Sequence, residues 1–306
     1  MDLSVSLGRE HPLVLKNPVI AASGTFGCGL EFAPFGDLGT LGGIAVKGMS
    51  LEARPGNPAP RIVETACGML NAIGLQNGGV EDFLANKLPL LPWRQTAIIA
   101  NIYATSVADF AALAERLSEV EGIAALEVNV SCPNVACGGM LFGADAAMCA
   151  QVTAAVRSHA PAKHVMVKLT PNVTDIASIA KSAADAGADS IACINTLSGM
   201  AIDARSRRPL LANVIGGLSG PAIKPVALRC VWQAAAAVDI PVIGLGGITE
   251  PLDVVEFLLA GASAIQMGTA NFMRPDASFR MVRDLPAVLA ECGAESAAEL
   301  IGGLRL

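Results

Sequence analysis

Short apolar runs alternate with Ala-rich segments of helical spacing along most of the chain. The runs expected to form strands are Val19–Ala22, Gly43–Val46, Ala97–Ala100, Ala124–Val128, Val165–Val167, Ser190–Ile194, Val242–Leu245 and Ala264–Met267. Unbroken apolar runs of this length are typical of parallel strands that are buried on both faces. The helix candidates are Ser106–Val120, Asp145–His159, Asp175–Ala186, Pro221–Ala237 and Pro251–Ala260. A short hairpin, Leu3–Leu7 with Leu13–Leu15, is expected before this series.

This alternation predicts an α/β fold with a parallel sheet, and eight strands favour closing it into a (β/α)8 TIM barrel rather than leaving it open. Helix starts are signalled at Thr174, Pro221 and Thr249, and helix ends at Gly187 and Gly261. Residues 1–306 are expected to form a single domain, because barrels of about 250 residues stand as one domain. Two stretches, Ser50–Pro92 and Gly199–Leu218, break the pattern and are expected as insertions at the C-terminal face, which commonly build or cover an active site.

Polar residues and glycines stand where the expected strands end. In strand order they are Ser23, Lys47, Asn101, Asn129, Lys168, Asn195, Gly246–Gly247 and Gly268–Thr269. A buried amide or ammonium without a partner costs free energy, so a ring of Asn and Lys at one barrel mouth indicates a bound polar molecule. Any single member has a structural explanation as a helix cap or a solvated side chain, but six together favour a ligand.

The glycines after the last two strands indicate a phosphate. Gly246–Gly247 and Gly268–Thr269 place backbone N–H groups where barrels of this kind commonly hold phosphate, and Gly220 before Pro221 offers another amide. Glycines also serve turn geometry alone. A phosphate beside an amide-rich mouth suits flavin mononucleotide (FMN). The order of glycines in Gly24–Gly29 does not match the fingerprint of a dinucleotide fold.

Charge and cysteine usage narrow the class of protein. The formal net charge of −6 argues against nucleic acid as a partner. Eight scattered cysteines in a chain of this size are expected to be free thiols in a reducing cytoplasm. Cys132 and Cys137 have the spacing that begins an iron–sulfur motif, but Met140 stands where the next ligand is needed, so no cluster or other metal is expected here. No signal peptide or membrane span is expected.

The string Asn129-Val-Ser-Cys-Pro-Asn-Val135 contains the candidate for catalysis. It places Cys132 in the loop after the fourth strand, between Asn129 and Asn134. Most lone cysteines are small buried hydrophobes, which is our interpretation of the other seven. A thiol with an ordinary pKa of about 8.5 can remove a carbon-bound proton when hydride loss relieves the product carbanion. Cys132 is therefore a candidate base.

Together with Asn71-Ala-Ile-Gly-Leu-Gln-Asn77 and Ile194-Asn-Thr196, this string resembles the dihydroorotate dehydrogenase family over nearly the whole chain. The membrane-bound class of that family carries Ser in place of this Cys and has an N-terminal extension, so we expect the cytosolic class 1. The continuation Ala136-Cys-Gly-Gly139 and the wording NAIGLQN resemble class 1B, the catalytic FMN subunit of an NAD-dependent enzyme. The alternative is class 1A, which reduces fumarate and tends to carry Met and Pro in the Gly-Leu segment.

The resemblance implies a role for each matching residue. FMN, one per chain, would contact Ser23, Lys47, Gly48, Asn101, Asn129, Lys168, Ile194, Gly220, Gly246, Gly247, Gly268 and Thr269. Dihydroorotate would contact Lys47, Asn71, Ala72, Ile73, Gly74, Leu75, Asn129, Asn134, Asn195 and Thr196. Cys132 would take the C5 proton while hydride leaves C6 for the flavin, giving orotate in the de novo synthesis of UMP.

The resemblance also implies partners. Class 1B chains form a homodimer core within a heterotetramer, in which a second subunit carries FAD and a 2Fe–2S cluster and reduces NAD. This chain shows no FAD or NAD fingerprint of its own. Neither nucleic acid nor a membrane is expected as a partner.

Three other functions stay open at this point. A dihydropyrimidine dehydrogenase module uses a similar Cys loop on a pyrimidine ring. A dihydrouridine synthase acts on tRNA and should be basic, which the net charge of −6 opposes. A flavin-binding assembly subunit that has lost its chemistry would not need an intact Cys132 and Lys47.

Overall fold

Eight parallel strands form a closed barrel in the computed structural model of the chain, which describes residues 1–131 and 142–305. The strands are β3 (Val19–Ala21), β4 (Gly43–Ala45), β7 (Ala97–Ile102), β8 (Ala125–Asn129), β9 (His164–Leu169), β10 (Ser190–Cys193), β15 (Val242–Leu245) and β16 (Ala262–Met267). Each pairs with the next in this order, and β16 pairs with β3 to close the ring. The predicted α/β barrel is confirmed, and every one of its strands falls on a predicted apolar run.

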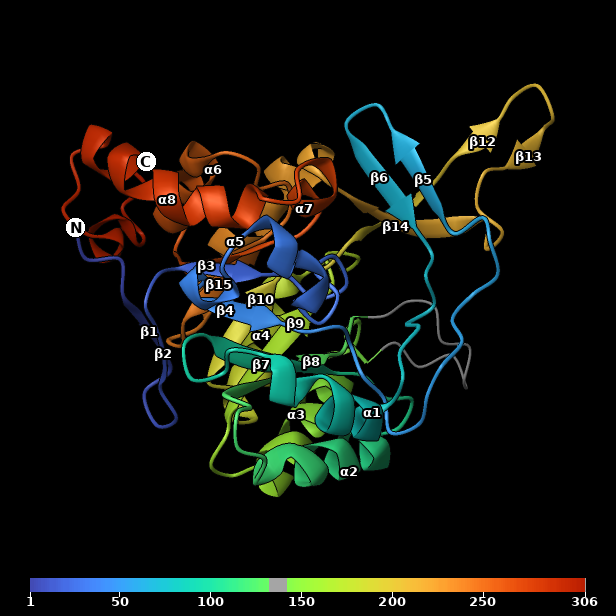
Figure 1. Ribbon diagram of the computed structural model, residues 1–306, viewed down its shortest axis with the longest axis horizontal. Helices are drawn as coiled ribbons and strands as arrows, with labels where there is room; N and C mark the ends of the chain where they lie inside the picture. The colour runs from blue at the N-terminus through green and yellow to red at the C-terminus, as the bar shows by residue number, and fades with distance from the viewer. Residues whose placement is uncertain (132–141, 306) are drawn as a thin grey trace.

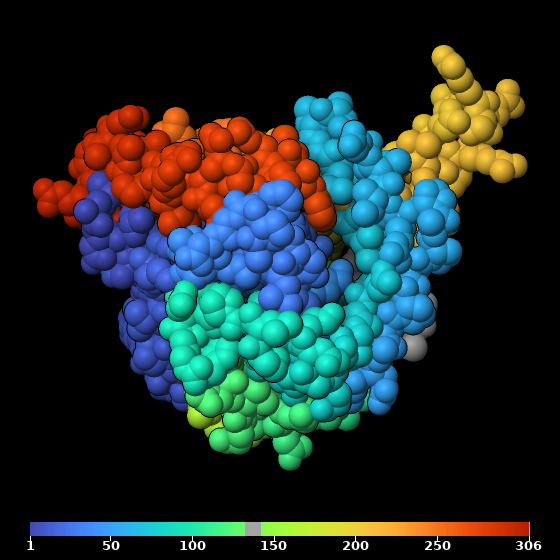
Figure 2. Space-filling view, in the orientation of Figure 1, coloured from blue at the N-terminus to red at the C-terminus, as the bar shows by residue number. Residues whose placement is uncertain are grey.

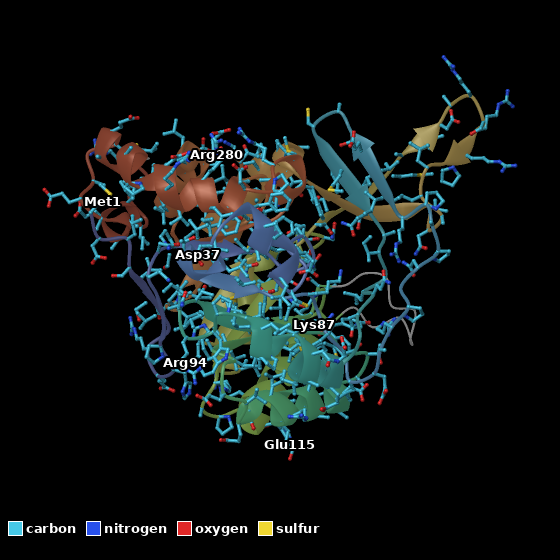
Figure 3. The ribbon with its side chains drawn as sticks, in the orientation of Figure 1. Met1, Asp37, Lys87, Arg94, Glu115 and Arg280 are labelled. Carbon is cyan, nitrogen blue, oxygen red and sulfur yellow. The ribbon has the colours of Figure 1, made fainter. Side chains whose placement is uncertain are left out.

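The helices surround the barrel (Figure 1). They are α1 (Val80–Asn86), α2 (Val107–Ser118), α3 (Ala146–His159), α4 (Ile176–Asp185), α5 (Lys224–Ala237), α6 (Pro251–Leu259), α7 (Ala270–Met273) and α8 (Ala277–Glu291). The five predicted helices are confirmed as α2 to α6, whereas α1, α7 and α8 were not predicted. Charged side chains labelled in Figure 3, such as Glu115 on α2 and Arg280 on α8, lie on the outer surface of this layer.

Local signals explain where the helices begin. Ser106, Asp145 and Asp175 each accept a hydrogen bond from a backbone N–H of the first turn, which satisfies a donor that the helix itself leaves unpaired. The start predicted at Thr174 is therefore off by one residue, because Asp175 is the cap. Pro221 opens a 3-10 turn, Pro221–Ile223, that runs directly into α5.

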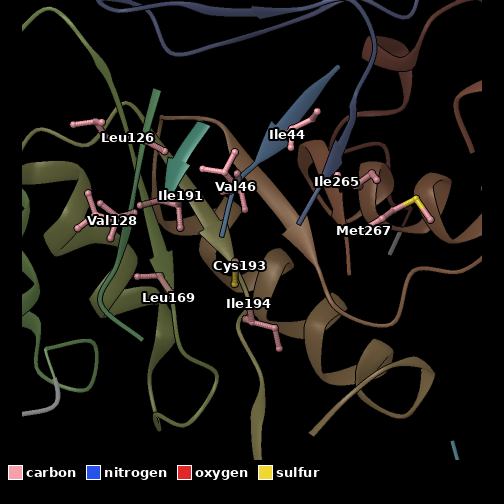
Figure 4. Packing of buried hydrophobic residues seen from close by; sticks show 14 of the residues in the cluster. Ile44, Val46, Leu126, Val128, Leu169, Ile191, Cys193, Ile194, Ile265 and Met267 are labelled. Carbon is pink, nitrogen blue, oxygen red and sulfur yellow. The ribbon is translucent and has the colours of Figure 1, made fainter. Parts of the chain in front are cut away.

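Two apolar clusters hold the barrel together. Outward-facing strand residues pack against the helices, and Figure 4 shows members of this cluster such as Ile44, Val128 and Ile265. Inside the barrel, the antiparallel hairpin of β1 (Val5–Leu7) and β2 (Leu13–Leu15) packs against inward-facing residues of the strands. The apolar side chains of the hairpin therefore close the barrel at the end opposite to the predicted ligand site, and their burial stabilises it.

The two insertions join into one antiparallel sheet. β5 (Ile62–Thr65) and β6 (Gly68–Asn71) come from the first, and β11 (Leu197–Met200) and β14 (Ile215–Ser219) come from the second. Their order is β11-β14-β6-β5, with Asn71 opposite Gly217. A further hairpin, β12 (Ile202–Asp203) with β13 (Arg208–Pro209), projects from the body of the molecule as an arm (Figure 2). Sequence patterning marked the insertions but not this pairing.

Among residues 1–131 and 142–305, we find no helix that is both long enough and apolar enough to cross a membrane.

Candidate active site

A cavity of about 390 Å³ opens at the carboxyl ends of the barrel strands, between them and the inserted sheet. Its size is in the range of small-molecule and cofactor sites. The predicted site residues that line it are Ser23, Lys47, Gly48, Asn71, Ile73, Gly74, Leu75, Asn101, Asn129, Lys168, Ile194, Asn195, Thr196, Gly220, Gly246, Gly247, Gly268 and Thr269. The structure thus brings side chains from every barrel strand end and from both insertions to one cavity.

Three predicted site residues are not placed in that lining. Cys132 and Asn134 lie outside the described residues. Ala72 is 1% exposed and packs with Leu70 and Leu211 under the inserted sheet. Its backbone N–H donates to the carbonyl oxygen of Arg61, and its own carbonyl oxygen accepts from the side-chain amide of Asn57. Both backbone groups of Ala72 are thus hydrogen-bonded within the chain, and Ala72 is not part of the cavity lining, unlike its neighbours Ile73 to Leu75.

The charge of the cavity is positive. Its described lining contains Lys47, Arg61 and Lys168 but no Asp or Glu. Burial lowers the pKa of Lys47, and the nearby Arg61 guanidinium lowers it further. Both effects oppose an ammonium that has no carboxylate partner among residues 1–131 and 142–305. An anionic ligand would relieve this cost, so the cavity is suited to an anion. Arg61 was not predicted as a site residue.

A buried carboxylate lies beneath the cavity floor. Glu127 of β8 is 0% exposed, and its Oε2 lies 3.6 Å from the Lys168 ammonium and accepts a hydrogen bond of 2.5 Å from Nδ2 of Asn101. Its Oε1 accepts from Nε2 of Gln266 at 2.5 Å. Glu127 and Gln266 were not predicted as site residues. The available signal was a charged or amide side chain in the middle of an apolar strand, in the runs Ala-Leu-Glu-Val-Asn and Ala-Ile-Gln-Met.

A hydroxyl joins two of the predicted asparagines. Ser131 donates from its Oγ to Oδ1 of Asn129 at 2.7 Å and accepts from Nδ2 of Asn195 at 2.6 Å. Oδ1 of Asn195 accepts from the backbone N–H of Thr196 at 2.8 Å. Each amide is therefore held in one orientation by its partners. Asn129 at the end of β8 and Asn195 after β10 are thus fixed side by side on one wall of the cavity. Ser131, which joins them, is the residue directly before Cys132 in the sequence.

The opposite wall is built of turns and a helix start. Gly246 and Gly247 have φ of 120° and 76°, backbone conformations that favour glycine. A Cβ on Gly247 would lie 2.9 Å from the backbone nitrogen of Lys224, so the turn packs directly on the start of α5. On the same wall, where Gly220 adjoins both Gly247 and Thr269, Oγ1 of Thr269 donates to Oγ of Ser219 at 2.8 Å. Hydroxyls and the positive end of a helix dipole, with no carboxylate in the described lining, are groups that suit a phosphate.

These parts define what the site can do. One end can hold a phosphate, the floor presents an ammonium and amides, and Lys47 with Arg61 can attract a second anion. Within the described part of the chain, no three His, Cys, Asp or Glu side chains are grouped in a way that could hold a metal ion. The chemistry therefore suits a phosphorylated cofactor with a polar ring and a small anionic substrate.

Comparison with known proteins identifies one family. The family model described as dihydroorotate dehydrogenase matches residues 11–289. The chain is 64% identical over 306 residues to a protein of Solidesulfovibrio magneticus named dihydroorotate dehydrogenase B (NAD(+)), catalytic subunit, covering 100% of this chain and 99% of that relative. Proteins with the same name in Maridesulfovibrio salexigens and Pelobacter propionicus are 58% and 54% identical, over 100% and 99% of this chain and 99% and 98% of those relatives.

Proposed function

The chain belongs to the dihydroorotate dehydrogenase family, and from this premise we propose that it is the catalytic subunit of an NAD-dependent dihydroorotate dehydrogenase. It oxidises dihydroorotate to orotate in pyrimidine biosynthesis. The observation that supports this function most is the cavity at the carboxyl ends of the barrel strands. Its described lining contains cationic and amide side chains but no carboxylate. A ring anion with amide groups, such as dihydroorotate, meets complementary groups there.

FMN is the cofactor that we propose for this cavity, in a single domain of residues 1–306. The fit rests on both ends of the site. Oδ1 of Asn101 is buried and lacks a hydrogen-bond partner, so it offers an acceptor to a flavin ring N–H. The Lys168 ammonium beside it offers a donor to the ring carbonyls. Gly220, Gly246, Gly247, Gly268 and Thr269 supply the wall suited to phosphate. Ser23, Gly48, Asn129 and Ile194 complete the proposed contacts.

The substrate is proposed to bind beside Lys47. The ammonium of Lys47 pairs with the substrate carboxylate, and Arg61 adds a second positive charge at the same wall. The side chains of Asn71, Asn129 and Asn195, with Thr196 and the backbone of residues 73–75, can donate to and accept from the ring amides. Because Ser131 fixes Asn129 and Asn195, these two amides are already oriented before the substrate arrives. Asn134 remains a proposal from the sequence alone.

Cys132 is proposed as the base. It directly follows Ser131, whose hydroxyl is buried between Asn129 and Asn195. The Cys132 thiolate accepts the C5 proton of dihydroorotate as the C5–C6 double bond forms. When bound, FMN supplies the acceptor for the C6 hydride. The chain's own residues orient the substrate and exclude water, since cavity walls of Ile194, Leu245 and Ile248 are apolar.

A partner subunit is proposed to pass electrons to NAD. The relatives are named catalytic subunits of NAD(+) enzymes, which supports this acceptor over fumarate. We infer that the partner carries FAD and a 2Fe–2S cluster in a heterotetramer built on a homodimer of this chain, and that the complex is cytoplasmic. Co-purification from the source cell followed by iron and FAD assays tests this. Iron with FAD supports the complex, and FMN alone with fumarate-dependent turnover contradicts it.

The proposed activity is tested by the bound flavin. Purified protein should show a flavin spectrum that dihydroorotate bleaches and orotate shifts, while uracil changes neither. Bleaching by dihydrouracil, or a spectrum that responds to uracil, would favour a dihydropyrimidine dehydrogenase activity instead. A flavin that no dihydropyrimidine reduces would favour a non-catalytic assembly subunit.

A further inference from the structure

Glu127 is a buried charge that the proposed reaction does not use. It lies inside the barrel on β8, with Asn101 opposite it on β7, and the next inward-facing position on β9 toward the cavity is Lys168. Glu127 is 0% exposed and is not part of the cavity lining, whereas its partners Asn101, Lys168 and Gln266 all are. The carboxylate therefore acts from beneath the floor on three side chains that face the ligand.

The hydrogen bonds set the direction of each amide. Because a carboxylate only accepts, Asn101 and Gln266 must both turn their NH₂ groups toward Glu127. This leaves Oδ1 of Asn101 without a partner, and Oε1 of Gln266 to accept from the Lys168 ammonium at 3.3 Å. The cavity floor consequently contains a buried, unpaired acceptor at Asn101 and a positioned ammonium at Lys168. A neutral carboxyl or carboxamide at this position would also carry a donor, so it would no longer enforce both amide orientations.

Stability alone is a poor reason for this arrangement. Buried ion pairs are often matched or exceeded in stability by apolar residues of similar volume, because each charge loses its hydration. Much of the barrel interior is filled by apolar residues such as Ala125, Met166 and Ile243. A carboxylate under the ligand site also cancels the charge of Lys168, whereas Lys47 has no such partner in the described chain. The carboxylate therefore limits the positive charge at the floor.

We propose that Glu127 is a positioning residue that sets the reduction potential of the flavin bound above it, by orienting Asn101 and neutralising Lys168. This inference rests on the proposed FMN site. A reduced flavin is richer in electrons than the oxidised form, so positive charge beside it favours reduction. Removing the carboxylate while keeping its shape leaves the Lys168 ammonium uncompensated. The flavin should then become easier to reduce.

The test is the reduction potential of FMN in the flavin-loaded full chain, measured at pH 6 by equilibration with a reference dye. Glu127→Gln should move the potential to a more positive value, by at least a tenfold change in the reduced-to-oxidised ratio, or about 30 mV for a two-electron couple. Glu127→Asp keeps the charge and should stay closer to the wild-type potential. If Glu127→Gln folds without retaining flavin, Glu127→Asp decides the outcome. A Glu127→Asp protein that retains flavin supports the proposal, and one that loses flavin overturns the proposal.

Asp189→Asn is the matched control. Asp189 is also a buried carboxylate in an ion pair, with Arg157, but it lies at the opposite end of the barrel strands, before β10. This variant should lower the melting temperature and leave the potential unchanged. An unchanged or more negative potential in Glu127→Gln, or an equal shift in Asp189→Asn, overturns the inference alone. A wild-type protein that binds no flavin overturns the proposed function, and this inference with it.

Discussion

Replacing Lys47 with methionine should separate ligand binding from stability. Methionine keeps an unbranched apolar stem and removes the ammonium that we propose for the substrate carboxylate. A hydrogen bond to a charged group contributes about 1.5–3 kcal/mol. Because about 1.4 kcal/mol corresponds to a factor of ten, orotate should bind roughly 10- to 150-fold more weakly to Lys47→Met. Arg61 remains at the same wall, so some attraction for the anion should persist.

Stability should move in the other direction. Burial lowers the pKa of Lys47, which means that the charged form is disfavoured in the folded state relative to the unfolded state. At neutral pH the ammonium therefore costs folding free energy, and methionine removes that cost. The melting temperature of Lys47→Met without ligand should equal or exceed that of the wild type. A residue needed only for the fold would show the opposite sign.

Titration of the bound-flavin spectrum with orotate measures the affinity, and thermal unfolding measures the stability. Lys87→Met is the matched control, because Lys87 carries the same charge in a solvent-exposed pair with Asp82 and does not line the cavity. Exposed pairs contribute only about 0–1 kcal/mol, so this variant should bind orotate as the wild type does. An orotate affinity in Lys47→Met within twofold of the wild type would refute the assignment of Lys47.

Three further predictions concern pH and the glycine wall. Because the pKa of Lys47 is lowered, orotate binding should weaken on the alkaline side before an ordinary lysine titrates, and a binding profile flat to about pH 10 would contradict this. Gly247→Ala forces an alanine into the left-handed backbone conformation, which costs about 1–2 kcal/mol, and pushes its Cβ against Lys224, so this variant should lose FMN. Gly293→Ala carries the same backbone strain but its Cβ meets no neighbouring atom, so this variant should keep FMN. The flavin content of the two purified variants tests this, and equal FMN content in both would contradict it. Burial lowers the pKa of His164, so as the pH falls the unfolded state takes up a proton at this residue before the folded state does. The free energy of unfolding should therefore decrease as the pH drops below about 6.5. Denaturant titrations should show a weaker dependence of this free energy on pH in His164→Gln.

The barrel was predictable because its signals are local. Each strand is a short apolar run that is buried on both faces, and caps such as Ser106 and Asp145 stand next to the helices they begin. The positions at the strand ends were equally accessible, because parallel strands in a barrel bring their carboxyl ends to one face. Lys47, Asn101 and Lys168 could thus be grouped without knowledge of the register.

The rest depended on contacts between distant segments. Glu127 and Gln266 are 139 positions apart, and only the closed barrel places their side chains within hydrogen-bonding distance. The pairing of β6 with β14 joins the two insertions across a similar separation. Ala72 stands between Asn71 and Ile73, which both line the cavity, but its own side chain packs with Leu70 and Leu211 under the inserted sheet. Pattern alone does not reveal such partners.

Rapid anaerobic mixing with dihydroorotate tests both the proposed oxidation of this substrate and the role of Cys132 in it. The wild-type protein should hold FMN whose absorption is bleached in a single turnover. Cys132→Ala should hold the same flavin and bleach at a small fraction of that rate, and the loss should be absent in Cys292→Ala, which changes an exposed cysteine outside the cavity lining. A wild-type flavin that dihydroorotate leaves oxidised would contradict the proposed function, and a Cys132→Ala protein that bleaches at the full rate would contradict the assignment of Cys132 as the base.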